Sequence, residues 1–319
     1  MRSINMDIEE NIEVDSQKEK KRKTRLKKNG KPRKRWGDRR DGRRVRTLPP
    51  MMYVVPFVMK DRCDAQNYFK SRVDMEIIEA YLRHKRGDLK SIGFMHIMAA
   101  AYVRLVSQKP ALNRFISGQR IFKRDDIRLS MVVKKAMDLN AQESMIKVIF
   151  DPRDTIDDVY NKMEEKIAIA RTAGDSNHFD RVARALFALP ALLFRGFIAL
   201  MRALDYFGLM PGVIDRASPF HASFFISNLG SLGIPPIYHH LYNFGNLPVF
   251  VTFGAMYRER TFDKDGKMVV KKYIDYTVVC DERITDGHYY ASAFKTMEYI
   301  MKHPFELDTP PKTVVEDID

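Results

Sequence analysis

The chain has 319 residues, 45% of them hydrophobic, and a formal net charge of +14 at neutral pH. This length and composition can bury one large core or two ordinary ones. The two cysteines, Cys63 and Cys280, are too few and too far apart for a disulfide framework or a metal-binding spacing, so we expect a reducing, cytoplasmic compartment.

The positive charge is concentrated near the N-terminus. Residues 18–46 hold 17 Lys or Arg against three acidic residues, a net charge of +14, so the rest of the chain is neutral in sum. A segment this charged cannot offset the entropy cost of ordering, and we predict a disordered basic tail over residues 1–50. It would attract anionic lipid, RNA or an acidic partner. Specific nucleic-acid recognition is not expected, because Trp36 is the tail's one aromatic residue for base stacking.

After Pro49-Pro50 the sequence alternates between helix and strand patterns. The spacing of apolar residues predicts helices over Met75–Arg86, Gly93–Pro110 and Thr155–Gly174, and a last helix from about His288. Runs rich in β-branched residues predict strands over Ile127–Lys135, Ser144–Phe150 and Phe224–Gly233. The turn sequence "DKDG" separates two further strand patterns and predicts a hairpin over Leu247–Cys280. The pattern indicates a mixed α/β domain.

One segment, Arg184–Val213, is almost entirely apolar but is interrupted by Pro190, Arg195, Gly196, Arg202 and Asp205. A membrane-spanning helix needs about 20 uninterrupted apolar residues. We therefore predict a helical insertion over 180–215, broken into a hairpin, that packs on the domain, lies in a membrane interface or caps a hydrophobic tunnel. With the basic tail, it makes peripheral membrane contact a hypothesis.

Two short motifs carry polar residues at strand ends. In "FFISNLGSLG" (224–233) a strand runs into a glycine turn after Ser227. In "VVCDERITDGHYY" (278–290) an apolar run breaks into Asp281, Glu282 and Arg283 and closes on Asp286-Gly287. Taken alone, Ser227 is consistent with a turn residue, and the charged cluster with a solvated strand end.

Together the motifs resemble the catalytic domain of the dihydrolipoyl acyltransferase family of 2-oxo-acid dehydrogenase complexes, which has the chloramphenicol acetyltransferase fold. The family's Asp-His-Arg-x-x-Asp-Gly is matched at Asp281, Arg283, Asp286 and Gly287, and its Ile-Ser-x-Leu-Gly at 226–230. The stretches "SRVDMEIIEAYL" (71–82) and "SQKPALNRFI" (107–116) add to the likeness. The resemblance implies a two-layer α/β sandwich with a mixed sheet over residues 51–305, followed by a C-terminal tail at 306–319.

The resemblance also implies a function: acyl transfer between a coenzyme A thioester and an acceptor, at sites between the subunits of a homotrimer. Ser227 would donate a hydrogen bond to the oxyanion. Asp286 would be a structural carboxylate paired with an arginine, for which Arg62 is our candidate, supported by Arg283, Gly287 and Asn228. No metal, no covalent lipoyl group and no lipoyl domain are expected, and the acceptor would be a small molecule or lipid-like compound.

Glu282 departs from the family, because it stands where the family has its catalytic histidine. Glutamate ordinarily titrates near 4.3, which matches a thiol near 8.5 poorly unless burial raises the carboxyl pKa. Three hypotheses remain open. Glu282 is the base; or another histidine replaces it, either His288 or one of the tandem pair His239-His240; or the chain is an inactive trimeric scaffold that keeps the fold.

Overall fold

The computed structural model describes residues 34–87, 90–134, 143–172 and 190–318. The chain divides into two units, Met1–Arg39 and Arg40–Asp319. The described part of the first unit is a turn in which the Asp38 amide donates to the Arg35 carbonyl over 3.0 Å and the Arg35 amide donates to Asp38 Oδ2 over 2.8 Å. The predicted disorder of the basic tail falls mostly outside the described residues.

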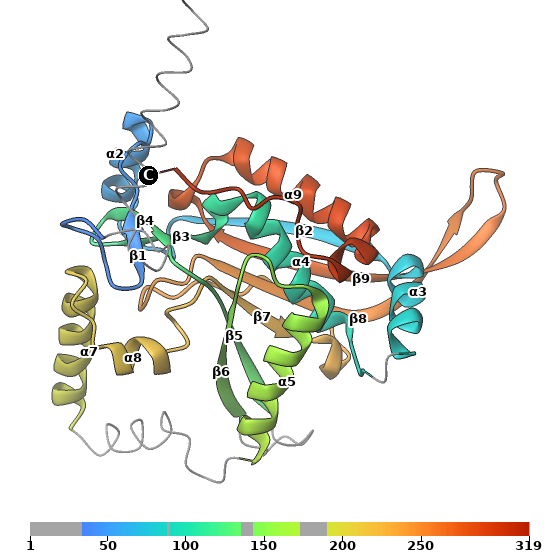
Figure 1. The fold of residues 1–319 in the computed structure, drawn as a ribbon, viewed down its shortest axis with the longest axis horizontal. Helices are drawn as coiled ribbons and strands as arrows, with labels where there is room; N and C mark the ends of the chain where they lie inside the picture. The colour runs from blue at the N-terminus through green and yellow to red at the C-terminus, as the bar shows by residue number, and fades with distance from the viewer. Residues whose placement is uncertain (1–33, 88–89, 135–142, 173–189, 319) are drawn as a thin grey trace, which may run out of the picture. The chain divides into compact units, whose positions relative to one another are not determined.

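The second unit is built on a six-stranded sheet with the strand order β2-β9-β8-β7-β5-β6 (Figure 1). β7 pairs in parallel with β5 and β8, and the remaining pairs are antiparallel, so the predicted mixed sheet is confirmed. The strands are β2 (Gln66–Asp74), β5 (Ile127–Lys134), β6 (Glu143–Phe150), β7 (Phe224–Asn228), β8 (Val249–Phe262) and β9 (Met268–Asp281).

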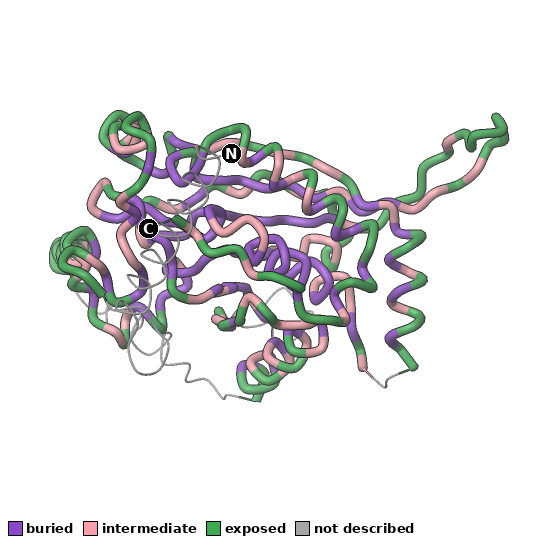
Figure 2. The backbone as a smooth tube through the Cα atoms, turned by 45° about the horizontal axis from the view of Figure 1, so that its top comes forward, coloured by how far each residue is buried: buried purple, intermediate pink, exposed green. Residues whose placement is uncertain are grey.

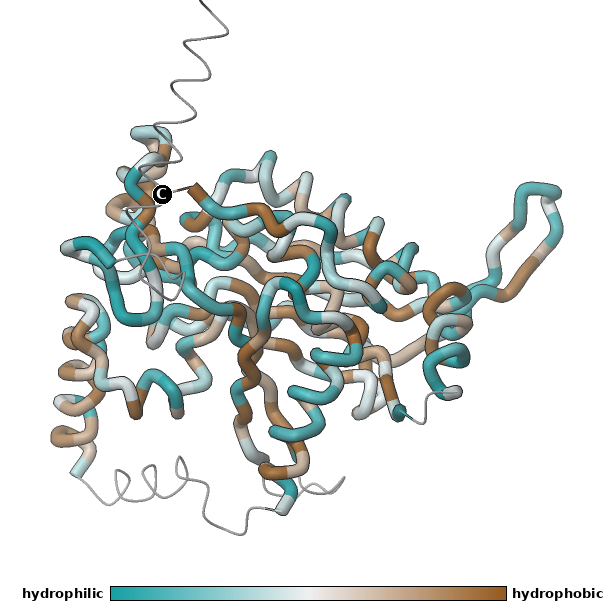
Figure 3. The backbone as a smooth tube through the Cα atoms, viewed as in Figure 1, coloured by the Kyte–Doolittle hydropathy of each residue, from teal (hydrophilic) through white to brown (hydrophobic). Residues whose placement is uncertain are grey.

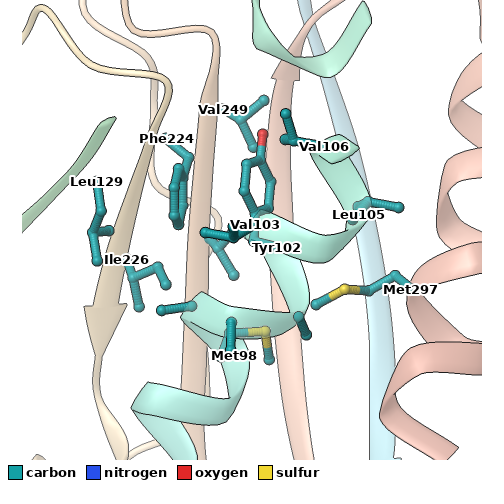
Figure 4. Packing of buried hydrophobic residues seen from close by; sticks show 14 of the residues in the cluster. Met98, Tyr102, Val103, Leu105, Val106, Leu129, Phe224, Ile226, Val249 and Met297 are labelled. Atoms are coloured by element: carbon teal, nitrogen blue, oxygen red, sulfur yellow. The ribbon is translucent and has the colours of Figure 1, made fainter. Parts of the chain in front are cut away.

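Helices cover one face of this sheet and form the main core. The helices that contribute to this core are α3 (Met75–Arg86), α4 (Phe94–Gln108), α5 (Ile156–Thr172) and α9 (Gly287–Lys302), as the apolar spacing predicts. α4 is buried continuously from His96 to Ser107. In Figure 4 it lies between the strands and α9, and Tyr102 stacks on Phe224 of β7 at 4.0 Å between ring centroids. This packing confirms the predicted two-layer α/β architecture.

The opposite face, here called the far face, carries Phe225, Phe250 and Val279. Strand side chains alternate between faces, so Phe224 and Ile226 join the main core while Phe225 joins a smaller cluster with Leu241 and Leu247. The loop that connects β7 to β8 supplies Leu241 and Leu247 and runs over this face. Met145 and Ile149 of β6 also lie on this face and are exposed, so the far face is only partly covered within one chain.

β8 and β9 continue as a hairpin beyond the rest of the sheet (Figures 1 and 2). Their register runs to Phe262 opposite Met268, and the turn between them is the "DKDG" of the sequence. Gly266 has φ +75°, which a residue with a side chain rarely adopts. The predicted hairpin is confirmed, and its tip leaves Phe262 and Met268 exposed.

A small second sheet shows that the folded unit begins earlier than predicted. Its strand order is β1-β4-β3, formed by β1 (Gly42–Arg44), β3 (Arg114–Ser117) and β4 (Arg120–Arg124). α2 (Pro50–Val58) follows β1. A side chain at Gly42 would meet the Lys123 carbonyl at 2.6 Å. The expected boundary at residue 50 is thus too late, because strongly basic sequence at 42–44 is part of a sheet.

The C-terminal residues also belong to the folded unit. After the 3₁₀ turn η4 (Pro304–Asp308), the Val315 amide donates to the Ser107 carbonyl over 2.8 Å. Arg114 forms a two-bond ion pair with Asp317, at 2.7 and 2.5 Å. The C-terminal tail expected from residue 306 is thus packed on the folded unit, and the apolar pattern gave no sign of these polar contacts.

The described part of the apolar segment forms two helices, α7 (Ala191–Tyr206) and α8 (Gly212–Ala217). α7 runs through Arg195, Gly196, Arg202 and Asp205 without a break. Residues 180–189 lie outside the described part. α7 buries only Met201 and Asp205, whereas Leu192, Leu193 and Leu200 are exposed on a helix coloured as hydrophobic in Figure 3. Within the described ranges, every helix is too short or too polar to cross a membrane.

Candidate functional site

The second motif is organised around a buried carboxylate, Asp281, the last residue of β9. Asp281 is fully buried, and Arg283 donates to both of its oxygens, from Nε and Nη2, over 2.8 Å each. Arg62 Nε donates to Asp281 Oδ2 over 3.2 Å. Period-two alternation along β9 places Asp281 on the far face with Val279 and Thr277. The motif is therefore locked to the strand end by an Arg–Asp–Arg cluster.

The expected pair of Arg62 with Asp286 is wrong, because Arg62 pairs with Asp281. Asp286 is instead the N-cap of α9, where its Oδ1 accepts from the Tyr289 amide over 2.7 Å. Side-chain acceptors at this position satisfy first-turn amides that have no helical partner. The signal that could have identified Asp281 is its position directly after the buried run "VVC".

The cluster has two guanidinium groups for one carboxylate, and backbone carbonyls accept most of the remaining N–H groups. Arg62 Nη1 donates to the carbonyls of Tyr242 and Gly245, and Arg283 Nη1 donates to those of Met59 and Lys60. Burial lowers the pKa of Arg62, while Asp281 counteracts the shift. The arrangement joins three segments of the chain at one point, so its role is structural.

Glu282 begins the 3₁₀ turn η3 (Glu282–Ile284), and only its backbone is fixed there. Its amide donates to the Ala65 carbonyl over 2.8 Å, while its side chain is exposed. Gly287 and His288, at the start of α9, are exposed as well. One chain alone does not provide the apolar surroundings that a glutamate base toward a thiol would need.

Ser227 lies near the end of β7 on the far face, in a row of hydroxyl groups. The strand register aligns Ser227 with Thr252 and Thr252 with Thr277. Thr277 donates to the Ile237 carbonyl over 2.5 Å. The Thr252 hydroxyl is buried and has no hydrogen-bond partner within the described residues. Ser227 is half-buried, so the residue is partly accessible on the far face.

The turn after Ser227 is fixed by Asn228 and Gly230. Asn228 Oδ1 accepts from the Ser231 amide over 3.1 Å, and the Asn228 carbonyl accepts from the Ser231 hydroxyl over 2.9 Å. A side chain at Gly230 would meet the Gly254 carbonyl at 2.7 Å. The Asn-Leu-Gly part of the motif thus serves the turn and holds the end of β7 against β8.

Within one chain, the two motifs lie at different levels along the strands of the sheet. β9 runs antiparallel to β8, which is parallel to β7, so Ser227 is level with Thr277 and four residues from Asp281 along the strand direction. Strand geometry then separates Ser227 from Asp281 by roughly 16 Å. The structure places the two motifs on the same face without bringing them together.

A cavity of about 280 Å³ opens beside the Asp281 cluster. Arg62 and Arg283 line it on one side, the 116–119 turn and α7 on another, and the loop at 243–245 closes it. Arg202 and Tyr206 come from α7. Glu282 does not line this cavity, so the motif presents Arg283 to the cavity and Glu282 to solvent.

The tandem histidines lie in the loop over the far face. His239 stacks on Phe250 with 4.1 Å between ring centroids and an interplanar angle of 4°, and its Nδ1 lies 3.3 Å from the His240 carbonyl. A proton on Nδ1 would leave Nε2 free to accept. Burial lowers the pKa of His239, so its imidazole is neutral at neutral pH. His239 therefore shares a face with Ser227, unlike the exposed His288 of α9.

Comparison with known proteins identifies the fold. A probable dihydrolipoamide acetyltransferase from Listeria monocytogenes has a TM-score of 0.52 at 13% identity, over 81% of this chain and 94% of its own. The dihydrolipoamide acetyltransferase of Azotobacter vinelandii has a TM-score of 0.52 at 12% sequence identity, over 83% of this chain and 94% of its own. No protein-family model and no curated sequence matches.

No cluster of three or more potential metal-binding His, Cys, Asp or Glu side chains occurs in the described residues.

Proposed function

We propose that this chain transfers acyl groups from a coenzyme A thioester to a small-molecule or lipid-like acceptor, at sites formed between the subunits of a homotrimer. The observation that carries this proposal is the placement of Ser227 and the Glu282 motif on one face of the sheet, roughly 16 Å apart. A second copy could bring its Glu282 to the first copy's Ser227. Covering by that copy would also remove Glu282 from water.

The residues would divide the chemistry as follows. The acceptor gives a proton to the Glu282 carboxylate and attacks the thioester carbonyl. Ser227 donates a hydrogen bond to the resulting oxyanion, and the intermediate collapses to release the CoA thiolate, which takes the proton back from Glu282. A preorganised donor to such an oxyanion typically lowers the activation barrier by about 3 to 4 kcal/mol.

Thioester turnover by the wild type, Glu282→Gln and Ser227→Ala tests the proposal. We expect each variant to lose about two to three orders of magnitude in kcat, because each removes a group that acts in the transition state. Ser231→Ala is the matched control, since its hydroxyl bonds only within the turn. A wild type without turnover would instead indicate the inactive scaffold.

His239 is the second candidate base, favoured by its neutral imidazole and its place on the face of Ser227. In the same assay, loss of turnover in His239→Gln together with retained turnover in Glu282→Gln would show that His239, and not Glu282, is the base. His240→Gln is the control, because it keeps the tandem loop and leaves the imidazole that stacks on Phe250.

We also propose that α7 contacts the surface of an anionic membrane. Its exposed leucines supply apolar contact, and residues 18–46 supply positive charge. Leu192→Glu with Leu200→Glu should reduce flotation of the full chain with phosphatidylserine vesicles severalfold. Ile169→Glu on α5 is matched to Leu200, since both side chains are 54% exposed. Equal flotation of all variants would contradict the proposal.

A further inference from the structure

A second cavity, of about 350 Å³, lies on the sheet beside α8 and contains a concentration of charge that the proposed acyl transfer does not use. β5 and β6 form its floor: the register places Arg128 opposite Ile149 and Ser130 opposite Lys147. α8 forms the wall with Asp215 and Arg216. The charged lining residues are Arg40, Asp41, Arg128, Lys147, Asp215 and Arg216, which sum to +2 when Lys147 is protonated.

Lys147 is held in this cavity by backbone groups alone. Its Nζ donates to the carbonyl of Asp215 over 2.7 Å and to that of His221 over 2.8 Å, which leaves its third N–H without a protein acceptor in the described chain. Burial lowers the pKa of Lys147 to about 7; Asp215 opposes the shift, and Arg128 and Arg124 add to it. The amine is thus a donor whose charge responds to pH near neutrality.

Arg128 is also only partly engaged. Its Nε donates to Asp126 over 2.7 Å and its Nη1 donates to Asp215 over 3.1 Å, so Nη2 remains available. Arg216 is exposed at the rim, with no side-chain hydrogen bond or ion pair in the described structure. Three donors from three elements, β5, β6 and α8, therefore line the same cavity with unused N–H groups. Guanidinium and ammonium groups in this arrangement suit a phosphate oxyanion.

Asp215 adds an acceptor to these donors. The residue is 5% exposed; Oδ2 pairs with Arg128, but Oδ1 is buried without a hydrogen-bond partner in the described residues. A buried carboxylate oxygen without a donor is costly. A ligand that brings a hydroxyl proton would satisfy it. A phosphate monoester keeps one proton below its second pKa of about 6, whereas sulfate carries none at these pH values.

We propose that this cavity binds the phosphate group of a small phosphorylated molecule in its singly protonated form. Lys147, Arg128 and Arg216 would donate to the phosphoryl oxygens, and Asp215 Oδ1 would accept the P–OH proton. The carboxylate selects phosphate over sulfate, because a fully ionised anion would be repelled there. Ile149 provides an apolar wall for the organic part of a monoester.

Titration calorimetry of the full chain with inorganic phosphate, methyl phosphate and sulfate, at matched ionic strength and pH 6, tests the site. We expect phosphate or its ester to bind at least about tenfold more tightly than sulfate, since only they satisfy Asp215. Tighter binding of inorganic phosphate identifies the free ion as the preferred form, and tighter binding of methyl phosphate identifies a monoester. Equal binding of phosphate and sulfate, or no binding of either phosphate, overturns the proposal.

Three variants sharpen this test. Asp215→Asn should abolish the preference over sulfate, and Arg216→Gln should weaken phosphate binding about tenfold. Arg258→Gln, on the exposed hairpin, is the charge-matched control. Circular dichroism checks that each variant folds. If Asp215→Asn unfolds, Arg216→Gln still tests the site, because Arg216 lies at the surface. If Arg258→Gln weakens phosphate binding as much as Arg216→Gln does, the net positive charge of the protein attracts the anion, and the proposed site is wrong.

The pH dependence gives an independent arm. Binding should fall about tenfold from pH 6 to pH 8, because Lys147 loses its charge and the ligand its proton. Lys147→Arg keeps the positive charge up to pH 8, so it should remove the part of the decrease in affinity that comes from deprotonation of Lys147.

Other titratable and charged groups surround the amine. The imidazole of His221 contacts Ser218 and Asp205. The other charged groups around the amine are Asp41, Asp126, Asp215, Arg40, Arg124, Arg128 and Arg216. Binding that strengthens with pH contradicts the proposal.

Discussion

Replacing Asp281 with alanine is expected to destabilise the folded unit by about 3 to 5 kcal/mol, because two buried guanidinium groups lose their shared carboxylate. Arg62 and Arg283 are 5% and 2% exposed and cannot regain full hydration without opening the structure. The loss is measured by urea unfolding followed by circular dichroism.

Asp286→Ala is the matched control, since it removes a carboxylate five residues later in the same motif. Its structural role is to cap α9, and removing an N-cap typically costs about 1 kcal/mol. The family pattern, with Asp286 as the arginine partner, would predict the larger loss of stability for Asp286→Ala. A larger loss for Asp286→Ala than for Asp281→Ala would contradict the geometry of the cluster.

Mixing two inactive variants should restore activity if each site takes residues from two copies. In a trimer co-assembled from equal amounts of Ser227→Ala and Glu282→Gln, about one quarter of the sites would combine an intact serine with an intact glutamate. Thioester turnover should therefore rise from nearly zero to about one quarter of the wild-type value. The measurement is a coupled thiol assay on co-expressed, differently tagged chains.

The control for this experiment is the same pair of variants purified separately and mixed without reassembly. Activity there should stay at the level of the single variants. A double variant, Ser227→Ala with Glu282→Gln in one chain, sets the background activity of sites that lack both groups. Co-assembled trimers that remain inactive would show that the proposed division between copies is wrong.

The fold was predictable because its elements are long and strongly patterned. The apolar spacing of 75–86 and 93–110, the β-branched runs and the "DKDG" turn each indicate the element that forms, and four motifs in order indicated the sheet that joins them. β2 was missed, because its alternating "QNYFKSRVD" has exposed Tyr68 and charged residues on an edge strand. There, pairing with β9 and not burial decides the structure.

The site was harder to predict, because the roles of its residues depend on distant partners. Arg62 is 219 positions from Asp281. The buried run "VVC" before Asp281 could have marked this carboxylate as buried, but it carries no information about which arginines pair with it. The alignment of Ser227 with Thr252 and Thr277 likewise follows from strand register alone. The C-terminal ion pair of Asp317 was missed for the same reason, since an isolated acidic residue near a chain end resembles any solvated one.

The pairing of β2 with β9 has a consequence for synthesis of the chain. β2 is an edge strand whose sheet partner is β9, which leaves the ribosome about 200 residues later, a delay of roughly 10 to 40 seconds at ordinary elongation rates. During that interval the backbone groups of β2 have no native partner in the sheet, and α3 directly after it cannot dock on β9. An unpaired strand edge favours aggregation, so we expect a nascent polypeptide that stalls before residue 268 to be more prone to aggregate than one in which β9 has emerged.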